Sequence, residues 1–316
     1  MSTASTSQRA IFADLGRSQW YLHLSRPSAG GSGFDLGWLG AVLGEARAAC
    51  TSASLELLLG FGPTLLGEFS NDVPDDFGPY ETIESADGSG RRAVGTQEEL
   101  LLWFHGSRTD DVWKAQYDTR ISLRPHFAVA RETPAFVYGE SLDMTGFVDG
   151  VGNPDDTERV AVATVAAGEP GAGGSHVIAQ RWVHDLGAWK RVATGEQEDI
   201  IGRRKWPGTD KLAVQAPQSH LRHVELRVDG NHGLSGSPER DEMWRRSTPY
   251  AFHDGTVGLY FLGFSASQAP LRERMRLMYG LDAADGVRDG LTDFSTPVSG
   301  SYYFAPSQQT LDAICG

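Results

Sequence analysis

The feature that most restricts the fold of this chain is an order of strands and helices that occurs twice. In the first half, apolar runs and helical spacing predict strands at 19–27, 55–63 and 98–106, helices at 34–50 and 108–121, and a strand or hairpin at 126–141. Thr109 is the expected N-cap of the second helix, and Pro134 is expected to interrupt the last strand. The order is strand, helix, strand, strand, helix, strand.

The second half repeats this order. The same patterns predict strands at 175–186, 223–228 and 256–266, helices at 187–204 and 270–280, and a short strand or loop at 300–306. Two ferredoxin-like βαββαβ units in an α+β fold are the simplest account. A length of 316 residues fits two domains, which we place at 1–145 and 146–316.

Four long glycine-rich segments do not fit a minimal repeat of this kind. They cover residues 64–97, 150–174, 229–242 and 281–299. Insertions of this length are more often functional or disordered than idle.

Charge and targeting signals exclude several classes of protein. A net charge of -13 argues against nucleic acid or an anionic membrane as the main partner. No apolar run is long enough for a membrane span, and the first residues have no secretory pattern. Cys50 and Cys315 form no paired-cysteine motif, so both are expected to be free thiols in a cytoplasmic protein.

Three short stretches contain residues that could carry chemistry. Asp149 lies in "GFVDGVGNP", where it is either an ordinary turn acid or a proton carrier in a dry pocket. His220 lies in an expected loop, with His223 three residues later, and it is either a surface residue or a ligand. Arg245 and Arg246 lie among aromatic residues, where they either form a cation–π cluster or face an anion. Histidine spacings typical of zinc sites, phosphate loops and dinucleotide motifs are missing from the sequence.

Taken together, "GFVDGVGNP", "SH" at 219–220, "RRSTPYA" and "GLYFLGF" resemble the B subfamily of dye-decolourising peroxidases. The resemblance implies two ferredoxin-like halves in a dimeric α+β barrel-type architecture, with one haem b per chain in the C-terminal half. It implies reduction of hydrogen peroxide and oxidation of dyes, phenols or other small reductants through a ferryl intermediate. Two alternatives stay open: a haem-handling protein with weak peroxidase activity, and a haem-free structural or regulatory protein.

The resemblance also implies roles for individual residues. His220 resembles the iron ligand, Asp149 the distal acid, Arg245 the distal arginine and Arg203 an arginine that contacts a haem propionate. The remaining expected haem contacts are Phe147, Val148, Gly150, Val151, Ser247, Leu259 and Phe261. Trp244, Tyr250 and Tyr260 are candidates for carrying an oxidising equivalent to bulky dyes.

The chain departs from the family pattern in three places, one of which is a longer stretch from His220 to Arg245 than in some relatives. Val151 and Gly152 stand where relatives usually have Thr and Glu, which puts the tuning of Asp149 in question. The final "LDAICG" lacks the apolar tail that directs some relatives into encapsulin shells. A homo-oligomer is expected, because the family often forms assemblies.

Overall fold

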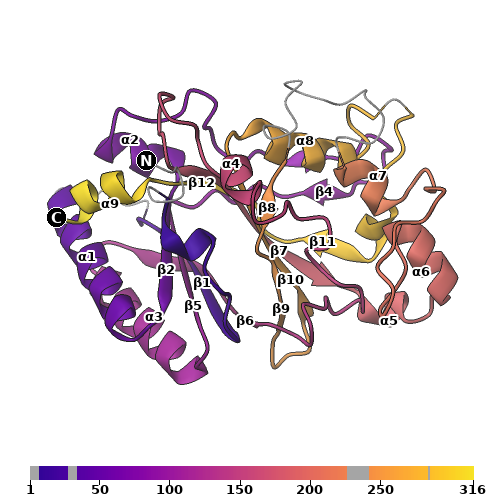
Figure 1. Ribbon diagram of the computed structural model, residues 1–316, viewed down its shortest axis with the longest axis horizontal. Coiled ribbons are helices and arrows are strands. Elements are labelled where there is room, and N and C mark those ends of the chain that lie inside the picture. The colour runs from indigo at the N-terminus through magenta and orange to yellow at the C-terminus, as the bar shows by residue number, and fades with distance from the viewer. Residues whose placement is uncertain (1–6, 28–33, 226–241, 284) are drawn as a thin grey trace.

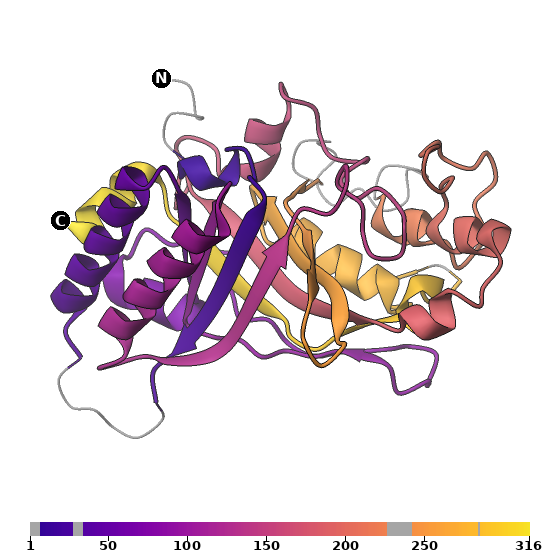
Figure 2. The same cartoon turned by 90° about the horizontal axis from the view of Figure 1, so that it is seen from below.

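One large antiparallel sheet organises the molecule. The computed structural model describes residues 7–27, 34–225, 242–283 and 285–316. The sheet has the order β6-β1-β5-β2-β12-β7-β10-β8, with β11 paired to β7 and β9 paired to β10. It curls until β9 lies beside β6, so that the two halves form a nearly closed barrel with helices outside (Figures 1 and 2). The predicted α+β class is confirmed.

The first half consists of four strands covered by two long helices. Its elements are η2 (Arg9–Ile11), β1 (Ser18–Ser25), α1 (Leu36–Ser52), β2 (Glu56–Phe61), α2 (Pro63–Phe69), β5 (Leu100–Gly106), α3 (Thr109–Leu123) and β6 (Ala128–Phe136). A separate two-stranded sheet joins β3 (Ile83–Glu84) to β4 (Arg92–Ala93). The side chains of α1, α3 and the sheet form one continuous apolar core, so packed side chains fill the interior of this half.

The second half repeats the strand order with shorter helices. Its elements are α4 (Arg159–Ala163), β7 (Ser175–His184), α5 (Leu186–Trp189), α6 (Thr194–Ile201), α7 (His220–Val224), β8 (Trp244–Arg245), β9 (Thr248–Ala251), β10 (Val257–Ser265), α8 (Ala269–Met278), η4 (Gly290–Asp293), β11 (Ser295–Pro297), β12 (Ser301–Ala305) and α9 (Gln308–Cys315). Within the described residues, no helix is long and apolar enough to cross a membrane.

Two predicted elements of the second half are wrong. The expected helix at 187–204 is divided into α5 and α6, because the Gln197 side chain donates to the carbonyls of Trp189 and Val192 and closes the end of α5. The expected strand at 223–228 begins inside α7, and its residues 226–228 lie outside the described part of the chain. β8 and β9 occupy its place beside β10.

Two details of the first half also differ from expectation. β6 runs through Pro134 without interruption, because β6 ends the hydrogen-bonded order and pairs only with β1. Thr109 is the first residue of α3, and Arg108 is the N-cap.

The last elements of the chain join the halves. Phe304 of β12 pairs with Phe61 of β2, which makes the sheet continuous. Helix α9 packs against α1, and a Cβ atom at Gly40 would lie only 2.1 Å from the carbonyl oxygen of Ile314. Arg47 of α1 forms an ion pair with Asp312 at 2.6 Å, so the first helix and the last helix hold each other.

Candidate active site

A cavity of about 570 Å³ lies in the second half, between the sheet and the helices α6, α7 and α8. This volume is in the usual range for a cofactor site. The apolar part of its lining includes Phe147, Val148, Val151, Leu259, Phe261, Met275, Met278 and Leu291. Polar groups enter from two opposite sides, and their positions define what the cavity can hold.

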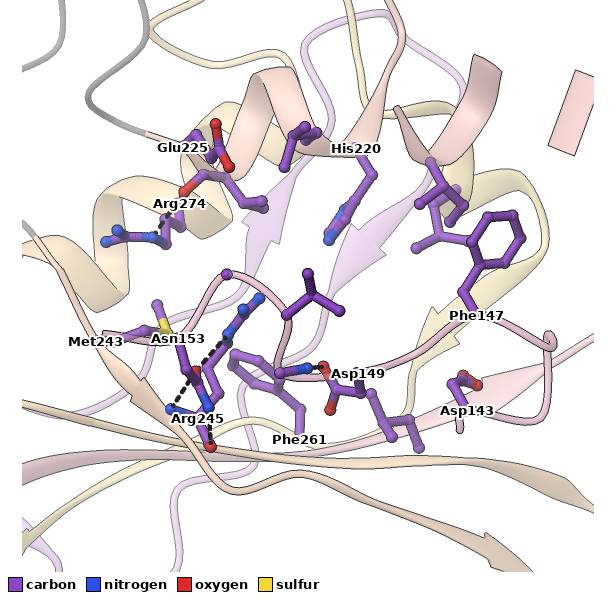
Figure 3. Close-up of a pocket in the computed structure, with 18 of the residues that line it drawn as sticks. Asp143, Phe147, Asp149, Asn153, His220, Glu225, Met243, Arg245, Phe261 and Arg274 are labelled. Atoms are coloured by element: carbon purple, nitrogen blue, oxygen red, sulfur yellow. Dashed lines mark hydrogen bonds between the residues drawn. The ribbon is translucent and has the colours of Figure 1, made fainter. Parts of the chain in front are cut away.

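His220 stands on one side of the cavity as the first residue of α7 (Figure 3). Its Nδ1 atom lies 2.6 Å from Oδ2 of Asp289, which is fully buried and also accepts the backbone N–H of Leu291. The carboxylate fixes the proton on Nδ1, so Nε2 is left with its lone pair toward the cavity. This is the arrangement of a metal-binding histidine.

Asp289 is a partner of His220 that the sequence motifs did not indicate. It lies in the predicted insertion at 281–299, but 69 residues separate it from His220. The only available signal was the length of the insertion, which says nothing about a particular acid.

Asp149 lies on the opposite side, in a tight loop that turns back on itself (Figure 3). The loop is fixed by an isolated bridge between Leu142 and Val148 and by the Asp149 N–H, which donates to the Ser141 carbonyl at 2.9 Å. Gly150 follows with a φ of 83°, a conformation that glycine adopts without strain. Its N–H donates to Oδ1 of Asp149 at 2.7 Å, which leaves Oδ2 available.

The surroundings of Asp149 act on its acidity in opposite directions. Burial raises the pKa of Asp149, and the nearby Asp143 adds to this effect. Arg245, the Gly150 N–H and His220 act to lower the same pKa, but burial prevails. Asp149 is therefore a weaker acid than a solvated aspartate, which suits a group that must both accept and release a proton.

Arg245 is held beside Asp149 by Asn153. The Asn153 side chain accepts from the Arg245 backbone N–H at 3.1 Å and from its Nε at 3.2 Å, and it donates to the Arg245 carbonyl at 2.9 Å. The structure shows that Asn153 orients an arginine 92 residues away.

Gly152 gives Arg245 and Arg203 room to approach each other. A Cβ atom at Gly152 would lie 3.2 Å from Nη2 of Arg245 and 3.5 Å from Nη2 of Arg203. Glu225 pairs with Arg203 at 3.4 Å. Burial lowers the pKa of Arg203, Glu225 raises it, and Arg245 lowers it further. The cavity therefore has a cationic edge that can accept an anionic substituent of a ligand.

Most of the predicted site residues line this one cavity. They are Phe147, Val148, Asp149, Gly150, Val151, Arg203, His220, Arg245, Leu259 and Phe261. Ser247 is different: it lines an adjacent cavity of about 120 Å³, which also contacts Asp149 and Arg245. The Ser247 hydroxyl accepts from the Leu262 N–H at 3.4 Å.

The other early candidates have structural roles. Arg246 lies over the rings of Trp103 and Trp244, so the cation–π interpretation applies to it. His223 bonds to the carbonyls of Ser219 and Val287. His184, the last residue of β7, also lines the cavity and bonds to Asp143 and Ser295.

The donor set of the cavity fits a haem better than a bare metal ion. Among the described residues, no group of three or more His, Cys, Asp or Glu side chains could hold an ion. A single imidazole backed by a carboxylate, apolar walls and a cationic edge suit a flat macrocycle with an axial ligand and acidic substituents. Asp149 and Arg245 face His220 across the cavity, and this arrangement is typical of a haem peroxidase.

Comparison with known proteins agrees with this class. Residues 140–310 match the family model described as Dyp-type peroxidase, C-terminal. A dye-decolorizing peroxidase of Brevibacterium linens is 30% identical over 284 residues, which cover 87% of this chain and 74% of that protein. The chain therefore belongs to the Dyp-type peroxidase family, and it is a peroxidase.

Solved structures show the same fold over almost the whole chain. The dye-decolorizing protein from V. cholerae superposes with a TM-score of 0.84 at 28% identity, covering 97% of this chain and 99% of that chain. DyPB from Rhodococcus jostii RHA1 gives a TM-score of 0.84 at 25% identity, covering 96% and 97%.

Proposed function

We propose that this peroxidase holds one haem b in the described cavity, with His220 Nε2 as the protein ligand to iron. The observation that carries the proposal is the His220–Asp289 pair, which faces Asp149 and Arg245 across an apolar cavity. Three variants of Rhodococcus jostii RHA1 DypB, each similar to this chain with a TM-score of 0.85 at 25% identity, have been solved in complex with haem. The haem supplies the redox chemistry with hydrogen peroxide, and the chain supplies ligand, proton transfer and charge.

Asp289 keeps His220 in the required tautomer. Its carboxylate holds the proton on Nδ1, which makes Nε2 the basic nitrogen and raises the electron density that His220 can donate. Because Asp289 is fully buried, water does not compete for this bond.

Asp149 moves the proton that peroxide cleavage requires. Its Oδ2 atom accepts a proton from one peroxide oxygen and returns it to the other, which departs as water. Oδ1 stays bonded to the Gly150 N–H throughout, so the carboxylate does not rotate away. The raised pKa makes the return of the proton easier than it would be from a solvated aspartate.

Arg245 stabilises the negative charge that develops on the departing oxygen. Three hydrogen bonds between Arg245 and Asn153 fix the backbone and Nε of Arg245, so the guanidinium is oriented before the substrate arrives. Arg203 at the cationic edge binds a haem propionate, and Ser247 acts from the adjacent cavity rather than in contact with haem.

The electron donors are small reductants, phenols or dyes that reach the haem edge or the protein surface. The acidic chain is not expected to bind nucleic acid or membranes. We also propose that the protein is a cytoplasmic homo-oligomer. Each protomer would consist of two domains, residues 1–145 and residues 146–316. A haem-handling protein would not need an acid and an arginine at the positions of Asp149 and Arg245. We therefore favour the peroxidase function over the haem-handling alternative.

The proposal is tested by the absorption spectrum of the haem-loaded protein before and after peroxide. His220→Ala is expected to abolish the native Soret band, because the remaining described residues offer no second imidazole at that side of the cavity. His253→Ala is the control, since this exposed histidine lies in the turn after β9. An unchanged spectrum in His220→Ala would remove the ligand assignment. Turnover no faster than that of free haem would remove the enzymatic role.

A further inference from the structure

A buried polar cluster lies between the two halves, away from the residues that line the cavity. Its centre is His23 of β1, which is fully buried. Its Nδ1 lies 2.7 Å from the Tyr303 hydroxyl, and its Nε2 lies 2.7 Å from the Tyr260 hydroxyl. One imidazole thus joins two tyrosines of the second half, and the peroxidase chemistry described above uses none of the three.

The hydrogen bonds of the cluster fix the direction of its protons. Burial lowers the pKa of His23 to about 4, so the ring is neutral and donates from one nitrogen only. Tyr303 donates to Oε2 of Glu98 at 3.4 Å, and Ser301 donates to the same oxygen. The Tyr303 oxygen must then accept from His23 Nδ1, which leaves Nε2 to accept the Tyr260 proton.

Tyr260 lies on the face of β10 opposite the cavity. Its neighbours Leu259 and Phe261 line the cavity, and successive side chains of a strand point to opposite faces. Tyr21 stacks on Tyr260 with ring centroids 3.5 Å apart. The Tyr21 hydroxyl bonds to Thr248 at 2.9 Å, and Thr248 lines the smaller cavity beside Asp149.

We propose that Tyr260 stores one oxidising equivalent of the peroxidase reaction, with His23 as its proton acceptor. The inference rests on the proposed haem site. One electron passes from Tyr260 to the oxidised haem, whose oxidant is hydrogen peroxide, and the phenolic O–H bond breaks as its proton moves to His23 Nε2. The products are a neutral tyrosyl radical and an imidazolium. A reductant that supplies one electron restores Tyr260, and His23 returns the proton.

The surroundings favour transfer of the electron and the proton together over transfer of either one alone. Burial raises the pKa of Tyr260 well above its usual range, so the phenol does not lose its proton unless an electron also leaves. Glu98 Oε2 lies 3.6 Å from His23 Nδ1 and stabilises the imidazolium that results. Stacking on Tyr21, which itself stacks on Trp103, lets adjacent rings share the electron deficiency.

The rival explanation is that the cluster only fastens the two halves together. Electron paramagnetic resonance distinguishes the two. The haem-loaded protein is mixed with peroxide, without reductant, and frozen. We expect a radical signal in the parent that narrows when tyrosine with a deuterated ring is incorporated, and its loss in Tyr260→Phe. Tyr302→Phe is the matched control, because Tyr302 is also buried and its hydroxyl has no hydrogen-bond partner among the described residues.

A second variant tests the proton acceptor. His23→Gln keeps hydrogen-bonding groups but cannot take up a proton, so the tyrosyl signal should be lost while the haem spectrum remains. A parent-like signal in Tyr260→Phe, a signal unaffected by deuterated tyrosine, or a parent-like signal in His23→Gln overturns the inference. If the parent haem spectrum does not respond to peroxide, the proposed function itself fails, and this outcome is separate from the others.

Discussion

The two halves of this molecule have the same strand order but different interiors. In the first half, α1 and α3, with 17 and 15 residues, lie on the sheet and fill the space with apolar side chains. In the second half, α5 and α6 have four and eight residues, and a cavity of about 570 Å³ remains above the sheet. The difference shows that shorter covering helices can turn a packed fold into a binding site.

The residues that work in the hollow half come mostly from outside the repeat. Asp149 and Asn153 lie in the connection between the halves, His220 begins a five-residue helix, and Asp289 lies in a late insertion. The strands of the repeat add mainly wall residues, among them Leu259 and Phe261 of β10 and Trp182 and His184 of β7, together with Arg245 at the end of β8. The repeat provides the frame, and the insertions provide the chemistry.

The largest expected effect concerns Asp149, in the half that contains the cavity. Asp149→Asn should slow the reaction with peroxide by about 10²- to 10⁴-fold, because the amide cannot carry the proton. Stopped-flow absorbance of the haem-loaded variant measures this rate. Asp156→Asn, at an exposed acid of the same connection, should react like the parent. A parent-like rate in Asp149→Asn would leave the cavity without a proton carrier.

A somewhat smaller effect is expected for Arg245, the charge partner of Asp149. Arg245→Leu should cost about 10²- to 10³-fold in the same rate. It should also change the pH dependence. In the proposed mechanism Asp149 acts only when ionised, so the rate should fall as pH drops through its pKa, which Arg245 acts to lower. The acidic limb of the profile should therefore move to higher pH in Arg245→Leu. If the acidic limb does not move, it reflects the ionisation of a group other than Asp149.

Two leucine-to-alanine substitutions, one in each half, test whether the first half is more tightly packed than the second. Leu102→Ala removes a fully buried side chain of β5 and should lower the free energy of unfolding by about 2–5 kcal/mol. Leu259→Ala removes a partly exposed side chain at the cavity wall, where less packing is lost, and should cost less. Denaturant unfolding of the two haem-free variants measures both values. Equal costs would mean that the second half is as well packed as the first.

The smallest expected effect comes from Asp289, the carboxylate paired with the proposed iron ligand His220. Asp289→Asn should weaken haem retention or the peroxide rate by about 10- to 100-fold, because His220 loses the anion that fixes its tautomer. The rate of haem transfer to a haem-scavenging protein measures retention. Asp285→Asn, an acid of the same insertion that pairs with Arg222, should match the parent.

Sequence patterns predicted the frame well where periodicity and burial coincide. Helix α1 and strand β10 were found because their apolar spacing follows their buried faces. The alternation at 223–228 misled, since α7 covers its first residues and the Arg245 segment, with its arginines, supplies the strand instead. Alternating polarity alone does not show which segment pairs with β10.

The site was predictable only as far as the family resemblance reached. It indicated His220, Asp149 and Arg245, which the structure brings to one cavity. Asp289 and Asn153 were missed because their partners are 69 and 92 residues away, and a single sequence contains no record of such distances. Ser247, predicted as a haem contact, lines the adjacent cavity together with Asp149 and Arg245.

The position of β12 has a consequence for how the chain is made. Residues 301–305 are the last strand along the chain, yet β12 lies in the middle of the sheet, between β2 and β7. While these residues are still being synthesised, β2 and β7 present unpaired edges that favour association with other chains. During translation, the protein is therefore most exposed to aggregation just before its final strand leaves the ribosome.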